Sequence, residues 1–405
     1  MMSKKTYDIT IIGAGVVGMS VAMQLQKKYP HLKTCVLDKE NAVAKHQTGH
    51  NSGVIHSGIY YKPGSLKAKN TQVGIKMLHD FCNEQNIKYE TCGKLIVAIK
   101  NDELPGLDAL YKRGIENGIK NLKILNKKEI SKIEPHVTAV SAIHVPITGI
   151  IDYTEVTKAY KRVYEQHGGV VILNALVNQI TKNNNQIEIK TPGYTIISKN
   201  LINCAGLYSD HIAKLAGTDP GLKIIPFRGE YYKLNAKKNN LVNHLIYPIP
   251  NPEFPFLGVH FTRMMDGVRE VGPNAVFAFK REGYHKFSFS LKDTLENLTY
   301  PSFWKMGIKY WKMGLKELSM SLCKPLFLQA VREMIPDINL NDLTPSEAGV
   351  RAQALEPGGI LVDDFRFVQS NNFLHVLNAP SPAATASLAI GKQILEKVEI
   401  NFGLG

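Results

Sequence analysis

One segment of this sequence, residues 46–61, is dense in side chains that can bind a ligand or move a proton. It reads His-Gln-Thr-Gly-His-Asn-Ser-Gly-Val-Ile-His-Ser-Gly-Ile-Tyr-Tyr, with three histidines, three glycines and several hydroxyls. Histidine titrates near working pH and suits acid–base catalysis. Glycine lets the backbone approach a ligand closely. The segment is therefore predicted to be a loop that contacts whatever ligand the preceding element holds.

That preceding element, residues 7–38, has the pattern strand, glycine-rich turn, helix, strand. One apolar run leads into Gly13, Gly15 and Gly18, and a second apolar run ends at Asp38. In dinucleotide-binding units these glycines allow the tight turn, the close approach of pyrophosphate and the packing of helix on strand. The acid that follows about twenty residues later binds the ribose hydroxyls. The pattern predicts a dinucleotide site and argues against NADP, but it leaves both NAD and FAD open.

The composition is that of an ordinary globular protein. Of 405 residues, 44% are apolar and 21% are charged, and no apolar run reaches the roughly 18 residues of a membrane-spanning helix. Because the first predicted strand begins at residue 7, no signal peptide is expected. The five cysteines form no C-x-x-C pair, which fits a reducing compartment and predicts no zinc site. The expected location is the cytoplasm.

The net charge of +14, from 49 basic against 35 acidic residues, suits nucleic acid, an anionic membrane surface or an acidic substrate. No nucleic-acid-binding motif is present, so no nucleic-acid partner is predicted. Residues 302–323 predict a helix with one apolar face and lysines beside it. That pattern fits either a helix lying on the inner surface of the cytoplasmic membrane or one packed on the protein. The apolar positions are Trp304, Ile308, Trp311, Leu315, Leu318 and Leu322, and the lysines are Lys305, Lys309, Lys312 and Lys316.

The order of predicted elements divides the chain into two interleaved domains. Strand and helix patterns alternate in 1–90, 150–218 and 350–405, which favours a discontinuous Rossmann-like domain that binds the dinucleotide. Residues 91–149 and 219–349 predict a substrate-binding domain built on an antiparallel sheet. The fold class is therefore α/β plus α+β.

Some element boundaries can be predicted from local patterns. Separate strands are expected at 194–198 and 201–206, where two apolar runs are split by polar residues. Strands at 226–234, 257–262 and 275–280 are expected to form one antiparallel sheet over the dinucleotide.

Three blocks of sequence carry a family resemblance. They are His-Asn-Ser-Gly-Val-Ile-His-Ser-Gly-Ile-Tyr-Tyr at 50–61; Phe-Leu-Gly-Val-His-Phe-Thr at 256–262 with Gly-Pro-Asn-Ala at 272–275; and Ala-Gly-Val-Arg-Ala-Gln at 348–353 with Asn-Ala-Pro-Ser-Pro-Ala-Ala-Thr at 378–385. On these blocks the chain resembles the L-2-hydroxyglutarate dehydrogenase/oxidase family, within the D-amino-acid-oxidase-like superfamily of FAD oxidoreductases. The resemblance covers nearly the whole chain. It departs at Asp38, where the superfamily more often has glutamate, and either acid can hold a ribose.

The resemblance implies FAD rather than NAD, and oxidation of L-2-hydroxyglutarate to 2-oxoglutarate. The glycine-rich turn and Asp38 would hold the ADP half, and the 46–58 loop would line the flavin. A helix over 383–397 would point its N-terminus at the flavin, where its dipole stabilises negative charge. The further cofactor contacts that the resemblance implies are His46, Asn51, Ser52, Gly53, Val177, Ala205, Gly206, Ser381, Ala383 and Ala384.

The implied reaction moves a hydride from C2 of the substrate to flavin N5 and the hydroxyl proton to a base. The resemblance matches Arg351 to the carboxylate-binding arginine of the superfamily, and a guanidinium fork suits a carboxylate. Histidine suits the base, and the choice between His56 and His260 stays open. The candidates for the second carboxylate and for nearby contacts are Tyr60, Tyr61, Arg228, Arg263, Asn274 and Lys280.

Other functions remain open at this point. The substrate can be another small acid, as in an amine or amino-acid oxidase or a glycerol-3-phosphate dehydrogenase. A flavin-binding module that docks on a membrane is the non-catalytic alternative. Quinone and oxygen both reoxidise flavins, and the basic charge favours a membrane quinone. No metal is predicted, because His46, His50 and His56 lack carboxylates at ligand spacing.

Overall fold

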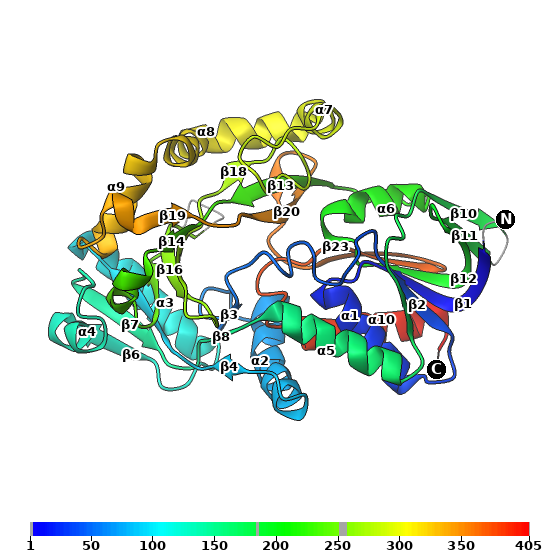
Figure 1. Ribbon diagram of the computed structural model, residues 1–405, viewed down its shortest axis with the longest axis horizontal. Helices are drawn as coiled ribbons and strands as arrows, with labels where there is room; N and C mark the ends of the chain where they lie inside the picture. Colours follow the sequence, from blue (N-terminus) through cyan, green and yellow to red (C-terminus); the bar gives the residue numbers. More distant parts are fainter. Residues whose placement is uncertain (1–2, 184–185, 251–256, 405) are drawn as a thin grey trace.

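A sheet with parallel strands at its centre organises one half of the molecule (Figure 1). The computed structural model describes residues 3–183, 186–250 and 257–404. Strands β12, β1, β2 and β9 run parallel in that order, and β2 is buried along its whole length, as expected when both faces of a sheet are covered. The eight strands are β1 (Ser3–Ile12), β2 (Thr34–Leu37), β9 (Val170–Ile172), β10 (Gln179–Asn183), β11 (Gln186–Lys190), β12 (Tyr194–Asn203), β22 (Arg366–Ser370) and β23 (Phe373–Asn378).

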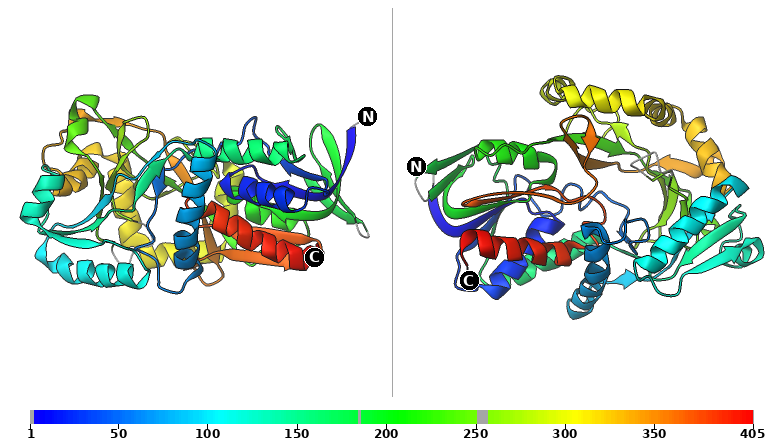
Figure 2. Two further views of the ribbon diagram at one scale, coloured as in Figure 1. Left: turned by 90° about the horizontal axis from the view of Figure 1, so that it is seen from below. Right: turned by 180° about the vertical axis from the view of Figure 1, so that it is seen from behind.

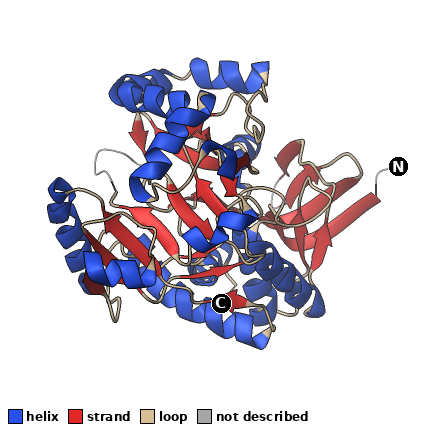
Figure 3. Ribbon diagram, turned by 60° about the vertical axis from the view of Figure 1, so that its left-hand side comes forward, coloured by secondary structure: helices blue, strands red, loops and turns tan. Residues whose placement is uncertain are grey.

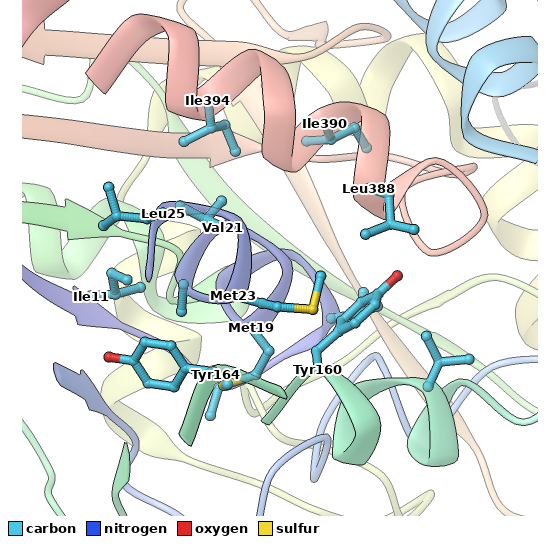
Figure 4. Close-up of a cluster of buried hydrophobic side chains, with 14 of the residues drawn as sticks. Ile11, Met19, Val21, Met23, Leu25, Tyr160, Tyr164, Leu388, Ile390 and Ile394 are labelled. Atoms are coloured by element: carbon cyan, nitrogen blue, oxygen red, sulfur yellow. The ribbon is translucent and has the colours of Figure 1, made fainter. Parts of the chain in front are cut away.

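Helices cover both faces of this sheet (Figure 2). They are α1 (Val16–Lys28), α2 (Leu66–Glu84), α5 (Tyr153–Gln166), α6 (Ser209–Leu215) and α10 (Ser387–Phe402). On one face α1 lies between α5 and α10, and their apolar sides close a core around Met19, Tyr160 and Ile390 (Figure 4). On the other face lies α6, while α2 packs against α10. This core fixes the first turn of α1, and with it the glycine-rich turn, at the end of β1.

The two strands predicted at 194–198 and 201–206 are one continuous strand, β12, so that prediction is wrong. The polar residues between the two apolar runs do not break the strand. The buried Ser198 hydroxyl donates to Asn200 O at 2.7 Å and accepts from Thr10 Oγ1 at 2.9 Å. Because the hydroxyl is satisfied inside the sheet, β12 can pair with β1 over its full length.

The start predicted for the C-terminal helix is also wrong. This helix, α10, begins at Ser387 rather than at residue 383. The preceding residues form turns in which Ala383 N donates to Pro380 O and Ala386 N donates to Pro382 O. A non-helical turn therefore stands where the helix N-terminus was expected.

Three further sheets form the other half of the molecule, with helices on its outer side (Figure 3). The largest has the order β19-β14-β17-β16-β15-β5-β7-β6, the second β18-β13-β20-β21 and the smallest β3-β8-β4. Their strands are β3 (Val54–Ile55), β4 (Tyr89–Glu90), β5 (Lys94–Ala98), β6 (Lys123–Asn126), β7 (Ser141–Val145), β8 (Gly149–Ile151), β13 (Lys223–Gly229), β14 (Tyr232–Leu234), β15 (Leu245–Pro248), β16 (His260–Arg263), β17 (Arg269–Gly272), β18 (Val276–Phe277), β19 (Leu343–Pro345), β20 (Gly349–Glu356) and β21 (Ile360–Leu361). The helices are α3 (Leu104–Glu116), α4 (Lys127–Ile133), α7 (Leu291–Leu298), α8 (Pro301–Leu322) and α9 (Lys324–Met334).

The single antiparallel sheet predicted from 226–234, 257–262 and 275–280 is in fact divided between two sheets. The strand predicted at 226–234 is split into β13 and β14, which belong to different sheets. The chain turns at Glu230, whose backbone N donates to Asn274 Oδ1 at 2.8 Å. Phe256, the first residue of one family block, lies outside the described residues.

The helix predicted at 302–323 exists as α8, but it does not pack through its apolar stripe. The α8 apolar stripe consists of Trp304, Ile308, Trp311, Leu315, Leu318 and Leu322, whose exposed fractions run from 46% to 74%. The helix instead buries Ser302, Met306 and Met320. The backbone is kinked at Tyr310, with φ −111° and ψ 15°. Among the described residues, no helix is long and apolar enough to cross a membrane.

Candidate active site

A cavity of about 1650 Å³ lies between the two halves of the molecule. It extends from the glycine-rich turn after β1, past the 46–61 loop, to β16 and β20. The turn at 379–385, which replaces the expected helix start, lines the same cavity. Segments far apart in the sequence therefore converge on one site that is large enough for a dinucleotide and a small substrate.

The glycine-rich turn leaves no room for side chains. Gly13 has φ +109°, and a Cβ there would lie 2.4 Å from Cys204 O. A Cβ on Gly18 would lie 2.0 Å from Gly13 O. Gly15 faces the cavity, so a phosphate can approach its backbone. The turn has the form that a bound pyrophosphate requires.

Asp38 and Thr48 fix the geometry of this turn. Asp38 Oδ2 accepts from Ala14 N at 2.6 Å, and Oδ1 accepts from Glu40 N at 2.9 Å. The carboxylate is thus held at the cavity wall, where the ribose is expected. Thr48 Oγ1 accepts from Val16 N at 3.0 Å and so satisfies a free N–H in the first turn of α1. Sequence reasoning missed Thr48, because its partner lies 32 residues away in the chain.

The structure brings all but one of the other predicted cofactor residues to the cavity wall. Gly53 is the exception: it does not line the cavity. Its φ is +64°, and its N donates to Asn51 Oδ1 at 2.8 Å, so it shapes the loop. The residues that do line the cavity are His46, Asn51, Ser52, Val177, Ala205, Gly206, Ser381, Ala383 and Ala384.

His46 does have carboxylate neighbours, contrary to the sequence expectation. Glu40 Oε1 and Glu282 Oε1 lie 2.9 and 3.2 Å from His46 Nε2. Lys39 Nζ pairs with both carboxylates and lies 2.9 Å from the same ring nitrogen. An ammonium group thus stands where a cation would bind, and we assign no metal to this cluster. Tyr284 Oη lies 3.0 Å from His46 Nδ1 and completes the contacts of the ring.

His56 and His260 lie together at the far end of the cavity. Burial, together with the charges of Arg351 and Lys94, lowers the pKa of His260 to about 3. Burial likewise lowers the pKa of His56 to about 3, with contributions from Lys94 and His260. Both rings are therefore neutral near pH 7, and each has one ring nitrogen without a proton.

The hydrogen bonding of His260 decides which of its nitrogens is the acceptor. Nδ1 lies 2.8 Å from Gly258 O, and a carbonyl oxygen can only accept. Nδ1 therefore carries the proton, and Nε2 keeps its lone pair. The ring stacks on Tyr247 with centroids 3.9 Å apart, which fixes its plane. His260 is oriented as a base would be.

Arg351 reaches the same end of the cavity from β20. Its backbone pairs with Phe227 of β13. Its charge acts on both His260 and Tyr231, and burial raises the pKa of Tyr231 to about 12. A guanidinium beside a neutral histidine can hold a carboxylate next to a hydroxyl that loses its proton.

The candidates for the second carboxylate separate into two groups. Tyr60 and Tyr61 line the cavity, whereas Arg228, Arg263, Asn274 and Lys280 do not. The buried Arg228 guanidinium binds Glu230 Oε1 at 2.8 Å, and Asn274 Nδ2 donates to Glu230 Oε2 at 2.9 Å. Both residues hold the turn between β13 and β14. Arg263 pairs with Glu90 instead, and Lys280 is exposed.

A family model described as FAD dependent oxidoreductase matches residues 8–397. The chain belongs to this family. It is 49% identical to the L-2-hydroxyglutarate dehydrogenase of Indibacter alkaliphilus, over 96% of this chain and 98% of that protein. It is 47% identical to the L-2-hydroxyglutarate dehydrogenase of Escherichia coli K12, over 97% and 93% of the two chains. The solved L-alpha-glycerophosphate oxidase of Mycoplasma pneumoniae, with FAD bound, is 25% identical, has a TM-score of 0.78 and covers 97% of this chain and 95% of its own.

Behind the wall of this cavity in the FAD-dependent oxidoreductase lies a buried lysine, Lys94, that sequence reasoning did not single out and that is not itself a lining residue. Lys94 begins β5, and all five residues of that strand are buried. Its Nζ lies 4.6 Å from the ring centroid of Tyr60 and 4.7 Å from that of Tyr247, and both tyrosines line the cavity. The available signal was a single lysine at the head of the apolar run Leu-Ile-Val-Ala, which is typical of a buried strand.

Proposed function

We propose that this oxidoreductase converts L-2-hydroxyglutarate to 2-oxoglutarate with FAD. One observation carries the proposal: a single cavity is lined by the glycine-rich turn, which forms a cradle for a dinucleotide, by an arginine and by an oriented neutral histidine. The cradle would hold the cofactor, the arginine a carboxylate and the histidine the hydroxyl proton. The choice of substrate is supported by relatives that are L-2-hydroxyglutarate dehydrogenases and are 43–49% identical over nearly the whole chain.

The proposed roles follow from the side chains at the far end of the cavity. Arg351 binds the carboxylate on C1, and His260 Nε2 accepts the proton of the hydroxyl on C2. Bound FAD would take the hydride that leaves C2. His56 lines the same cavity, and its neutral ring adds no positive charge that would oppose protonation of His260. Tyr60, Tyr61 and Tyr247 exclude water.

We also propose which residues form each of the two domains. The FAD-binding domain consists of 1–90, 150–218 and 350–405, and the substrate-binding domain of 91–149 and 219–349. The eight-stranded sheet with β1 at its centre supports this division, since its strands come from all three segments of the first domain. The exception is the start of 350–405, where β20 and β21 pair with β13 and with each other in the other half.

An anaerobic titration tests the substrate. The purified holoprotein is mixed with L-2-hydroxyglutarate, its D-enantiomer, lactate or glycerol 3-phosphate, while the flavin band at about 450 nm is recorded. We expect only the L-dicarboxylate to bleach the band within seconds. Bleaching by lactate or glycerol 3-phosphate instead would overturn the substrate, and a flavin band unchanged by all four compounds would overturn the catalytic role.

We further propose that the α8 apolar stripe rests on an anionic membrane surface, where a quinone accepts the electrons. Ile308 is 74% exposed, and both tryptophans of the chain lie in the stripe. Phe287 and Phe289, which precede α7, are 88% and 61% exposed. Aromatic and aliphatic side chains flanked by lysines suit the boundary between headgroups and acyl chains. The net charge of +14 favours anionic lipid.

Charge reversal tests the membrane contact. Replacing Lys305, Lys309, Lys312 and Lys316 by glutamate is expected to lower binding to vesicles containing phosphatidylserine at low salt by at least about 100-fold, at roughly 1 kcal/mol per lysine. The measurement is co-sedimentation. The matched control reverses four exposed lysines near α4, namely Lys120, Lys123, Lys127 and Lys128. Equal losses in both variants would show nonspecific attraction, and no sedimentation of the wild type would remove the membrane proposal.

A further inference from the structure

Lys94 carries a buried amine that has no counter-ion among the described residues. Its exposed fraction is 0%, and its Nζ has no hydrogen-bond partner among the described residues. The two tyrosine rings beside it offer cation–π contact, which stabilises a desolvated ammonium only in part. Burying a charge without a partner is costly, and proteins usually pair such groups with a carboxylate. The missing anion is therefore expected to arrive with a ligand.

Lys94 is not itself a lining residue, but two tyrosine rings beside it form part of the cavity wall. Tyr60 and Tyr247, which flank the ammonium, both line the cavity. The Tyr60 hydroxyl is also buried and has no hydrogen-bond partner among the described residues. An ammonium and a phenol that both lack an acceptor are the two groups that one carboxylate would satisfy.

The position of Lys94 relative to the reacting groups matches a dicarboxylate. His260 feels the charges of both Arg351 and Lys94, so both cations lie within electrostatic range of the proposed base. In 2-hydroxyglutarate the hydroxyl is next to one carboxylate and three carbon–carbon bonds away from the other. Arg351 and His260 account for the first carboxylate and the hydroxyl. Lys94 accounts for the second carboxylate.

We propose that Lys94, with the Tyr60 hydroxyl, binds the distal carboxylate of the substrate and so selects 2-hydroxy dicarboxylic acids over monocarboxylic ones. This inference rests on the proposed function, because it assigns one end of the same substrate. It also explains why a lysine is buried in an otherwise apolar strand. Among the predicted candidates, Arg228 and Arg263 already pair with Glu230 and Glu90, and Lys280 is exposed.

The proposal has a consequence for pH. Burial lowers the pKa of Lys94 to about 7 in the unliganded protein, while His56, His260, Tyr60 and Tyr247, which face it, are neutral at that pH. Lys94 is charged below about pH 7 and loses its charge above it. A bound carboxylate would raise this pKa, so the affinity for a dicarboxylate should fall by up to about tenfold per pH unit above pH 7.

Ligand binding to the oxidised holoenzyme tests the assignment without turnover. The product 2-oxoglutarate and its analogue 2-oxovalerate, whose five carbons end in a methyl group, are titrated while the flavin spectrum is recorded. In the wild type we expect 2-oxoglutarate to bind about 100-fold more tightly than 2-oxovalerate. In Lys94→Met this preference should fall to within about threefold, through weaker binding of the dicarboxylate alone. Lys100→Met, on the exposed turn after the same strand, is the matched control and should keep the preference.

The outcomes separate the inference from the proposed function. A Lys94→Met holoenzyme that retains the wild-type preference overturns the role of Lys94, and so does a wild type that does not discriminate between the two ligands. Reduction of the wild-type flavin by L-2-hydroxyglutarate is scored separately and tests the proposed function alone. If Lys94→Met fails to fold, the pH dependence of the wild type provides the test. A ratio of the affinities for 2-oxoglutarate and 2-oxovalerate that stays constant from pH 6 to pH 9 overturns the assignment.

Discussion

Replacing Gly13 by alanine is expected to abolish FAD binding and to lower the free energy of unfolding by more than about 3 kcal/mol. The residue has φ +109°, a conformation that costs an L-residue roughly 1–2 kcal/mol. The added Cβ would also lie 2.4 Å from Cys204 O and 2.8 Å from Cys204 C. These are backbone atoms immediately after β12, so they cannot move without shifting the sheet. The turn would have to open, and the phosphate cradle would open with it.

Gly118→Ala separates conformational strain from steric overlap. Gly118 also has a positive φ, +75°, but nothing lies within 4 Å of a Cβ placed there. It should lose about 1 kcal/mol and keep its cofactor. Thermal unfolding and the ratio of flavin to protein absorbance after purification measure both effects. If Gly13→Ala has the same unfolding temperature as Gly118→Ala and carries a full complement of FAD, the glycine-rich turn has been wrongly assigned as the phosphate site.

The parts of the fold that sequence predicted are those governed by local patterns. The unit from β1 to Asp38 is contiguous, and each of its glycines has a reason that can be read from spacing. The break between β13 and β14 was missed because it depends on Asn274, which lies 44 residues from Glu230. The continuity of β12 was missed because Ser198 is satisfied by Thr10 in a neighbouring strand. Tertiary hydrogen bonds overrode the local pattern in both places.

The active-site residues show the same difference between local patterns, which sequence can predict, and tertiary contacts, which it cannot. Family blocks pointed to Arg351, His56 and His260, all of which line the cavity. Lys94 was not singled out, since a lysine in a strand is usually exposed and only the surrounding burial shows otherwise. Of the two carboxylates beside His46, Glu282 was unexpected because it is far away in sequence, whereas Glu40 lies only six residues away and was overlooked. Spacing finds groups that act with their chain neighbours, and it does not find groups that the fold brings together.

Replacing His260 by asparagine is expected to slow reduction of the flavin by L-2-hydroxyglutarate by about 10²- to 10⁴-fold, the usual contribution of a general base. Asparagine can still donate a hydrogen bond to Gly258 O, so the side chain should keep its orientation. It lacks a nitrogen at the position of Nε2, which is the proposed acceptor of the hydroxyl proton. Binding of 2-oxoglutarate should change by less than about threefold, because it needs Arg351 rather than the base. Stopped-flow reduction and equilibrium titration measure the two quantities.

The His56→Asn variant is needed to tell which histidine is the base, because the pKa cannot: burial lowers it to about 3 in both rings. Among the hydrogen bonds of the described residues, the His260 ring has one that fixes its tautomer, so the loss in His56→Asn should be smaller by at least about tenfold. A pKa of about 3 also means that His260 stays neutral as the pH falls. The kcat/KM of the wild type should therefore not fall from pH 7 to pH 5 and should rise by at most about twofold as Lys94 becomes fully charged, whereas an ordinary imidazole would lose activity below about pH 6.5. A greater loss in His56→Asn than in His260→Asn would reverse the assignment.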